Sequence, residues 1–196
     1  YTHGMGAAVT PVNKVTDEGL PVLYVKNLPP TSTKEKLNIK QPAIYYGEKQ
    51  SDYVIADTKS KEFHYPRQEE NIYKNYTGKG GVKLDSALSR ILLAINFRSY
   101  KIFLNTDITD ESRLLYHRNI QERIAKALPF LELDSDPYLV IANGELKWIQ
   151  DAYTQTGNYP YSASIGGDNY MRNSIKIVVD AYDGTIDAYL MDENDP

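Results

Sequence analysis

The sequence predicts an α+β fold in which antiparallel β-hairpins pack with two central α-helices. Two hairpin signals lie in the last third of the chain, and two stretches with helical periodicity lie in its middle. Short strand-like runs come before them, so the order is strands, then helices, then strands. This order segregates the two kinds of element instead of alternating them, which is typical of α+β folds.

The first hairpin signal turns at Asn143-Gly144. An Asn-Gly pair between apolar, β-branched runs is the strongest short-range cue for a two-residue hairpin turn. Such a turn pairs Ile141 with Leu146 and Leu139 with Trp148, and it places all four side chains on one face. We therefore expect this face to be the core face and Trp148 to be largely buried.

The second hairpin signal contains Asp183-Gly184, and three loop lengths compete there. A two-residue loop would set Asp180 opposite Asp187, and facing like charges destabilise a strand pair. A three-residue loop would mix core and polar residues on one face. A four-residue loop over residues 181–184 pairs Asp180 with Thr185, Val179 with Ile186 and Ile177 with Ala188. It also leaves Gly184 free to adopt a positive φ, so we predict the four-residue loop.

Two helices are expected between the early strands and these hairpins. Asp85-Ser86 offers an N-cap for a helix that runs to about Arg98, with Leu88, Ile91, Leu92 and Ile95 on one face. Residues 109–112 offer a second N-cap, and Pro129 ends the second helix. Its stripe consists of Tyr116, Ile120, Ile124 and Leu128, and its polar face of Asn119, Glu122 and Lys126. Residues 100–104 fit either a strand or a helix.

The first 84 residues predict strands and loops. Residues 1–20 are small and Gly-rich, and we expect an extended arm that docks on another part of the structure. Strands are expected at 21–27, 43–46, 53–56 and 62–65. Residues 66–81 are polar and Gly-rich, which predicts a loop.

Composition limits the function more than it defines it. A chain of 196 residues can form a single domain with its own core, so we expect 1–196 to be one domain. The net charge of -4 argues against nucleic-acid binding, which needs a basic face. No cysteine is present, so thiolate nucleophiles, disulfides and cysteine-bound zinc are excluded. No apolar run reaches the roughly 20 residues of a membrane span. The chain starts at Tyr1 without a signal-peptide pattern, so we expect it to be part of a longer polypeptide.

Motifs that carry chemistry are weak in this sequence. The three histidines, His3, His64 and His117, show no metal-ligand spacing, which favours structural or surface roles. The segment from Tyr76 to Gly81 could cradle a phosphate but lacks the Walker spacing, so a flexible loop is favoured. No nucleophile, base and oxyanion donors are assembled in sequence, and we expect no catalytic residue, metal or cofactor.

Acidic residues cluster at Glu132, Asp134 and Asp136. Paired carboxylates could bind calcium or hydrolyse a glycosidic bond, and the second possibility makes a cell-wall hydrolase the rival enzymatic hypothesis. A solvated turn before Pro137 explains the same cluster more simply.

Tyrosine is strongly over-represented, with 17 Tyr against 4 Phe and 1 Trp. Half-buried strand positions explain most of this excess, because a tyrosine ring has one apolar and one wet end. The connector between the two hairpins nevertheless concentrates four of them with Gly157 and Pro160. Loops on a rigid scaffold often carry function, so Tyr153, Tyr159, Tyr161 and Tyr170 form the candidate surface for a glycan or peptide ligand.

Several motifs together resemble one family, the bacterial uncharacterised protein family 0182. The most specific are Tyr1-Thr-His-Gly4, Asp136-Pro-Tyr138, Tyr159-Pro-Tyr-Ser162 and Val179-Asp-Ala-Tyr-Asp-Gly184. Met5 and Ala188 depart from the family pattern, which usually has Tyr at the first position and a larger aromatic at the second. The resemblance implies a bacterial membrane protein with several N-terminal spans and a large extracytoplasmic region that would contain this chain. Its partners would be the rest of its own chain and an envelope ligand or protein, and no catalytic residues are implied.

Overall fold

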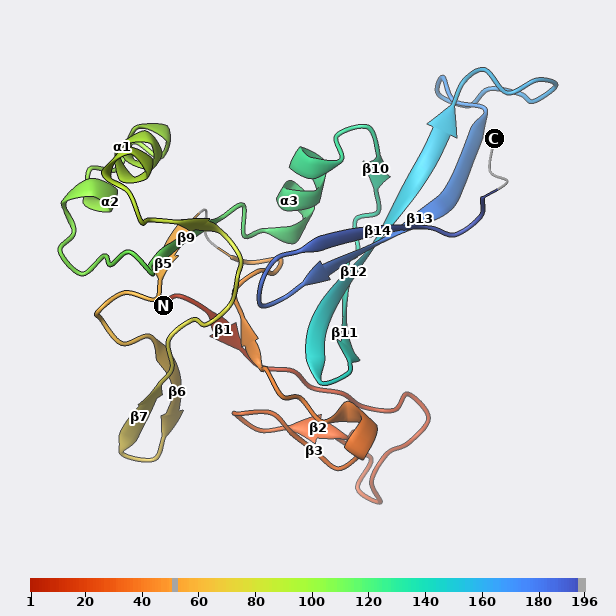
Figure 1. Ribbon diagram of the computed structural model, residues 1–196. Helices are drawn as coiled ribbons and strands as arrows, with labels where there is room; N and C mark the ends of the chain where they lie inside the picture. Colours follow the sequence, from red (N-terminus) through yellow and green to blue (C-terminus); the bar gives the residue numbers. More distant parts are fainter. Residues whose placement is uncertain (51–52, 194–196) are drawn as a thin grey trace.

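The computed structural model describes residues 1–50 and 53–193 and confirms an α+β fold (Figure 1). Its largest unit is an antiparallel sheet of β10 (Glu132–Leu133), β11 (Tyr138–Ala142), β12 (Glu145–Thr156), β13 (Tyr170–Asp180) and β14 (Ile186–Leu190). β12 and β13 pair along most of their length and form a ribbon that projects from the body of the molecule (Figure 1). The loop between them therefore lies at a tip, far from the N-terminus.

The first hairpin has the predicted register. Leu139 pairs with Trp148 and Ile141 with Leu146. Asn143 and Gly144 have φ values of 55° and 88°, which are the positive values that a type I′ turn requires. Trp148 is half-buried rather than largely buried. It packs against the main core, and its indole Nε1 donates to the backbone oxygen of Tyr46 at 3.0 Å.

The second hairpin has the predicted four-residue loop. Val179 pairs with Ile186 and Ile177 with Ala188, while Asp187 lies opposite Val178. The amide of Asp180 donates to the oxygen of Thr185 at 3.0 Å, and Gly184 has a φ of 69°. The Asp180 carboxylate accepts the backbone N–H groups of Tyr182 and Asp183 at 2.8 and 2.7 Å, so it closes the turn as an Asx cap.

The second predicted helix begins eleven residues later than expected. Arg113–Tyr116 is a strand, β9, which pairs with β5 (Tyr53–Ala56) and with β8 (Val82–Lys83). Leu114 and Leu115 are both fully buried, one in each of two hydrophobic clusters, because opposite faces of this strand are covered. The helical stripe assigned to Tyr116 was therefore wrong: strand pairing overrides the helical spacing there.

The helix itself, α3 (Ile120–Ala127), is capped by Asn119, whose side chain accepts from the amide of Glu122 at 3.0 Å. Ile120 and Ile124 are fully buried in the main core, and Leu128 packs against it. Glu122 and Lys126 face solvent, as the stripe predicts. The second half of the predicted helix is thus confirmed.

The first predicted helix is confirmed as α1 (Ala87–Asn96), with the Ser86 side chain accepting from the amide of Ser89. Residues 100–104 resolve as a short helix, α2 (Lys101–Leu104). Both pack on the smaller core, which consists of Leu84, Ile102, Ile108 and Leu114. The four-residue stripe of α1 points away from that core and is exposed.

Short two-stranded pairs complete the structure. β1 (Gly4–Met5) pairs with β4 (Ala43–Ile44), β2 (Val25–Lys26) with β3 (Thr31–Ser32), and β6 (Phe63–Arg67) with β7 (Glu70–Tyr73); a 3-10 turn, η1, covers Glu35–Leu37. The strand expected at 21–27 shrinks to two residues. The loop expected at 66–81 contains β7, because Gln68 adopts a φ of 52° and lets the chain turn back.

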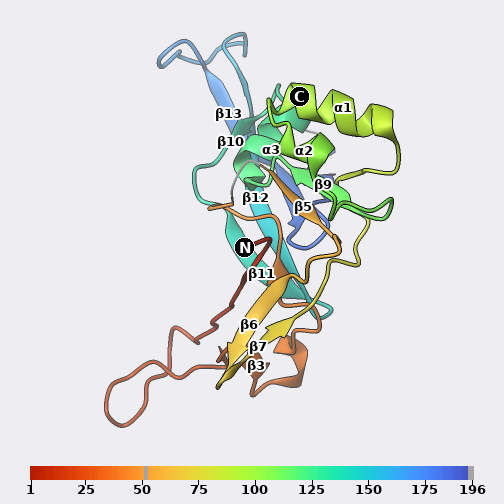
Figure 2. The same ribbon diagram turned by 90° about the vertical axis from the view of Figure 1, so that its left-hand side faces the viewer.

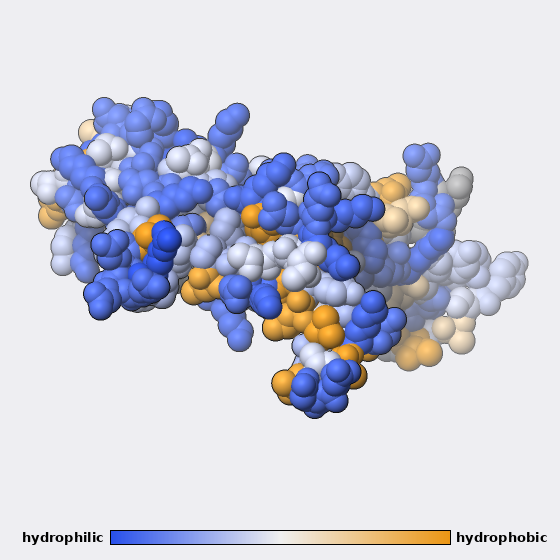
Figure 3. Space-filling view, turned by 90° about the horizontal axis from the view of Figure 1, so that it is seen from below, coloured by the Kyte–Doolittle hydropathy of each residue, from blue (hydrophilic) through white to orange (hydrophobic). Residues whose placement is uncertain are grey.

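The N-terminal arm docks through its first residues and then loops away from the body (Figure 2). Val12, Val15 and Leu20 in this arm are exposed. From below, the surface is mostly hydrophilic, and apolar side chains gather in its middle and on a projection (Figure 3). Within residues 1–50 and 53–193, no helix is both long enough and apolar enough to cross a membrane.

Candidate functional site

The candidate binding surface is the tip of the β12–β13 ribbon. The rings of Tyr159 and Tyr170 stack there with centroids 4.8 Å apart and an interplanar angle of 15°. Tyr161 is fully exposed, and Tyr159 is 41% exposed. Beside them lies an open cleft of about 550 Å³, lined by Gln155, Ser162, Ala163, Ile165, Asp168, Asn169, Tyr170 and Met171.

The tip is held in shape by one asparagine. The Asn169 side chain accepts from the amide of Tyr159 at 2.9 Å and donates to its oxygen at 2.7 Å. The hydroxyl of Ser162 donates to the backbone oxygen of Asn169 at 2.8 Å. A side chain at Gly157 would come within 2.4 Å of the oxygen of Gly167, so the two glycines allow the loop ends to approach. The exposed rings are therefore presented by a loop with fixed internal contacts.

Tyr153, the fourth candidate, lies elsewhere. It sits lower on β12, opposite Glu132 of β10, and its hydroxyl donates to the Asp134 carboxylate at 2.6 Å. Its ring is half-buried. The structure therefore stacks Tyr159 on Tyr170, leaves Tyr161 exposed two residues after Tyr159 on the same loop, and holds Tyr153 in a hydrogen bond on the sheet.

The acidic cluster is arranged as a turn. The other oxygen of Asp134 accepts the amide of Asp136 at 2.9 Å, while Glu132 and Asp136 themselves are exposed. The hydrogen bond from Tyr153, followed by that from Asp136, lowers the pKa of Asp134. An ionised Asp134 suits the nucleophile or base of a glycosidase and not its general acid, which must hold a proton near neutral pH. Both of its oxygens, however, already accept hydrogen bonds from the Asp136 amide and the Tyr153 hydroxyl. The geometry thus favours the turn over the hydrolase.

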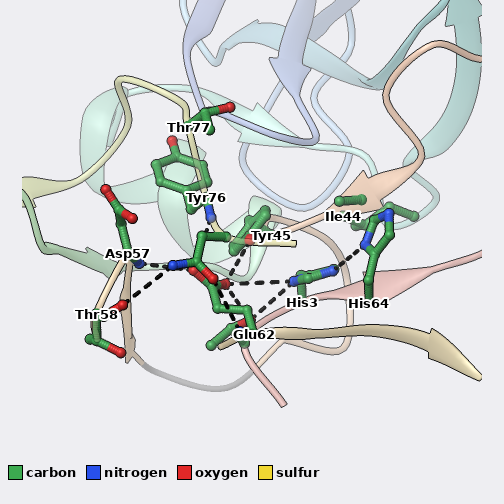
Figure 4. A network of polar contacts seen from close by, with 12 residues as sticks. His3, Ile44, Tyr45, Asp57, Thr58, Glu62, His64, Tyr76 and Thr77 are labelled. Atoms are coloured by element: carbon green, nitrogen blue, oxygen red, sulfur yellow. Dashed lines mark hydrogen bonds and ion pairs between the residues drawn. The ribbon is translucent and has the colours of Figure 1, made fainter. Parts of the chain in front are cut away.

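A buried carboxylate, Glu62, is the centre of a network of polar contacts (Figure 4). One of its oxygens accepts the hydroxyls of Thr2 at 2.6 Å and Tyr45 at 2.7 Å. The other accepts the backbone amides of Asp57 at 2.8 Å and Tyr76 at 2.9 Å. Burial alone would raise the pKa of Glu62, but the nearby His3 ring and the hydrogen bonds from Thr2 and the two amides lower it to about 2. The carboxylate is therefore ionised and fully paired.

Two histidines extend this network outward (Figure 4). His3 Nδ1 lies 3.8 Å from the Glu62 carboxylate, and His3 Nε2 lies 2.9 Å from Nδ1 of His64. Burial, followed by repulsion from His3 and Lys74, lowers the pKa of His64 to about 4. One ring nitrogen of the pair donates to the other, so these two atoms are hydrogen-bond partners. Among the described residues, no three His, Cys, Asp or Glu side chains converge as metal ligands.

Sequence reasoning missed this cluster, because His3 and His64 are 61 residues apart. The expected structural role fits their burial and their partners. His117 lies apart from both, and its Nδ1 forms a hydrogen bond with the Glu122 carboxylate at 2.9 Å.

Arg118 locks the same N-terminal segment to the core. Its fully buried guanidinium donates to the oxygens of Tyr45 at 2.7 Å and Thr2 at 2.5 Å, and to the Gln50 side chain at 3.0 Å. Burial lowers its pKa to about 10, which leaves it charged at neutral pH. Glu62 and Arg118 together fix Thr2 and His3, so this network anchors the arm and assembles no nucleophile.

The glycine-rich segment after Tyr76 already holds an anion of its own chain. The Asp183 carboxylate accepts the amide of Lys79 at 3.1 Å and the hydroxyl of Tyr76 at 2.6 Å. Arg113 donates to the backbone oxygens of Lys79 at 2.7 Å and Gly80 at 2.6 Å. The flexible loop expected here is instead tied to β9 and to the β13–β14 turn, and Asp183 fills the place a phosphate would need.

Comparison with known proteins identifies relatives along the whole chain. The profile described as "Uncharacterised protein family (UPF0182)" matches residues 1–196. A UPF0182 protein of Geobacter sulfurreducens is 52% identical over 197 residues, which cover 100% of this chain and 22% of that protein. A UPF0182 protein of Pelotomaculum thermopropionicum is 46% identical over 197 residues, covering 100% of this chain and 21% of that protein.

The chain thus spans about a fifth of the length of the curated relatives it matches. No solved structure matches it significantly. Both the family profile and relatives that are 46% and 52% identical match the whole chain. The chain therefore belongs to the uncharacterised protein family UPF0182.

Proposed function

We propose that this chain is a ligand-binding domain on the extracytoplasmic side of a multi-spanning bacterial membrane protein, and that the tip of the β12–β13 ribbon is its binding surface. One observation carries the proposal: at the projecting tip of the ribbon, Tyr159 of the loop stacks on Tyr170 of β13, and Tyr161 of the same loop is fully exposed. Large rings exposed on a rigid scaffold are typical of recognition surfaces, because little side-chain entropy is lost on binding.

The chemistry of the tip favours a glycan of the cell envelope. Flat tyrosine faces suit the apolar faces of sugar rings, and the cleft beside them offers the hydrogen-bonding side chains of Gln155, Ser162 and Asn169. Lysine and arginine are absent from residues 157–170, so an anionic group is not the main recognition element.

The location rests on the family resemblance and on the length of the relatives, which leaves about four-fifths of each relative outside this chain. That remaining chain, including its membrane spans, would be the first partner of this domain. These 196 residues contain no cysteine, so a thiol introduced here reports on this domain once the labelling of the unsubstituted full-length protein is subtracted. Ser164→Cys in the full-length protein should react with a membrane-impermeant maleimide in intact cells, and the protein without the substitution serves as control. Reaction only after the cells are opened would contradict the location.

The binding role is tested with purified peptidoglycan sacculi as the probe. The 196-residue chain should co-sediment with sacculi, and Tyr161→Ala combined with Tyr159→Ala should reduce the bound fraction at least about tenfold, since each stacked ring contributes roughly 1 kcal/mol or more. Tyr138→Ala is the matched control, because Tyr138 is 46% exposed but lies on β11. Equal sedimentation of both variants would refute the assignment of the tip.

The rival function, a cell-wall hydrolase acting through Glu132, Asp134 and Asp136, makes a different prediction in the same assay. Asp134→Asn would then abolish release of soluble fragments from the sacculi without reducing binding. We favour the binding role because both carboxylate oxygens of Asp134 accept hydrogen bonds from the chain itself, from the Asp136 amide and the Tyr153 hydroxyl.

A further inference from the structure

The helix pair α1–α2 exposes an apolar face that no other described part of the chain covers. Figures 1 and 2 both show the pair at an outer edge of the molecule, and Figure 1 places it at the opposite end from the ribbon tip. Seven large side chains on it are between 41% and 71% exposed: Leu88, Ile91, Leu92, Ile95, Tyr100, Phe103 and Leu104. A contiguous apolar face of this size marks an interaction surface.

The exposed residues are not displaced core residues, because other side chains of the helix pair face the smaller core. Leu93, Ala94 and Phe97 pack inward against the smaller core, and Ile102 of α2 is fully buried in it. The helix therefore already has its core-facing side, and the exposed stripe is a second apolar side. Between α1 and α2 lies a shallow hollow of about 560 Å³, lined by apolar side chains together with Ser99 and Arg98.

The charge of the helix pair differs from that of the whole chain. The chain carries a net charge of -4, yet residues 87–105 contain Arg90, Arg98 and Lys101 and no carboxylate. Arg90 is paired with Asp110 at 3.1 Å. Arg98 and Lys101 are exposed and form no ion pair with the described residues. Asp85 and Asp107 lie just outside the segment at its two ends.

We propose that the α1–α2 face docks on an anionic lipid surface. A short amphipathic element with Leu, Ile, Phe and Tyr on one side and free cations at its edge is the pattern of a helix that lies in the membrane interface. With ten and four residues, α1 and α2 are too short to cross a bilayer, so they would lie along it. Tyr100 would occupy the headgroup level, where amphipathic rings are enriched, and Arg98 and Lys101 would contact the anionic headgroups.

Vesicle co-sedimentation of the 196-residue chain tests this proposal. The chain should bind vesicles of phosphatidylcholine with 30% phosphatidylglycerol more tightly than pure phosphatidylcholine vesicles. Leu92→Gln with Ile95→Gln should weaken binding roughly tenfold for each side chain, because both are apolar groups that the interface would bury. Lys101→Gln should weaken binding about fivefold, and only to the anionic vesicles.

The matched control is Val12→Gln with Val15→Gln, which removes two apolar side chains of the N-terminal arm that are at least as exposed as Leu92 and Ile95. This control should bind as the original chain does. Circular dichroism should show that the variants remain folded, since the substituted positions are exposed.

Three outcomes would overturn the proposal. In the first, the chain remains in the supernatant with both vesicle types. The partner of this face would then be a protein surface and not a lipid surface. In the second, the Leu92 and Ile95 double variant binds the anionic vesicles as tightly as the control. The third is concentration-dependent dimerisation in sedimentation equilibrium that the same double variant abolishes, because the occupant would then be a second copy of the chain.

Discussion

The buried carboxylate of Glu62 offers the sharpest test of how the fold is held together. Glu62→Gln keeps the shape of the side chain and removes its charge. One amide oxygen can still accept the backbone N–H groups of Asp57 and Tyr76, but the amide nitrogen then faces the hydroxyls of Thr2 and Tyr45 and cannot accept from them. The variant should therefore lose the charge-specific part of the network while retaining its packing.

The size of this loss follows from the pKa. The pKa of Glu62 falls from 4.5 to about 2 in the folded state, and each pKa unit corresponds to about 1.4 kcal/mol. The ionised side chain, which is only 3% exposed, thus contributes about 3 kcal/mol at neutral pH. Because the folded pKa is lowered, this stability is present above pH 4.5 and is lost as the pH falls toward 2. About 2 kcal/mol of it should disappear between pH 7 and pH 3.

Urea denaturation at the two pH values measures this effect. The difference in unfolding free energy between the original chain and Glu62→Gln should be about 3 kcal/mol at pH 7 and about 1 kcal/mol at pH 3. Glu70→Gln is the control, since Glu70 is exposed on β7, and it should change stability by less than about 0.5 kcal/mol at either pH. A Glu62→Gln difference that is equal at pH 7 and pH 3 would refute the charge-based account.

Three further predictions concern the core, a turn and a buried histidine. Ile124→Ala should lower the unfolding free energy by about 2–5 kcal/mol, because Ile124 is fully buried in the main core; a change near zero in urea denaturation would contradict the packing of α3. Gly184→Ala should destabilise the fold by about 1–3 kcal/mol, because φ at this position is 69° and the new Cβ would lie 2.6 Å from the Tyr46 ring. An unchanged melting temperature in thermal unfolding would argue against this turn. The pKa of His64 falls from 6.5 to about 4 on folding, so the folded state binds fewer protons than the unfolded state between these pH values. The unfolding free energy should therefore rise as the pH increases from 4 to 6.5. A His64 titration by NMR with a midpoint near 6.5 would show that the ring is not buried as described.

Local chemistry determined the parts of the fold that could be predicted. The registers of both hairpins follow from Asn143-Gly144 and Asp183-Gly184, where positive φ and side-chain caps limit the turn to one geometry. The start of α1 follows from Ser86 in the same way. Each of these features depends on residues within a few positions of one another, so the sequence pattern contains the necessary information.

The candidate surface was predictable only in part. The density of tyrosine in the connector pointed to Tyr159, Tyr161 and Tyr170, and the structure places these three at the ribbon tip. Tyr153 could not be separated from them by sequence, because its hydrogen bond to Asp134 depends on β10 pairing with β12.

Tertiary structure alone decided the remaining features. Residues 113–116 have helical spacing in the sequence, but β5 and β8 recruit them into a sheet whose two faces are both buried. The contacts that join His3, Glu62 and His64 close loops of about sixty residues, and the apolar stripe of α1 faces outward because its opposite side already packs on the smaller core. Such pairings are set by the packing of distant segments, and no local periodicity encodes them.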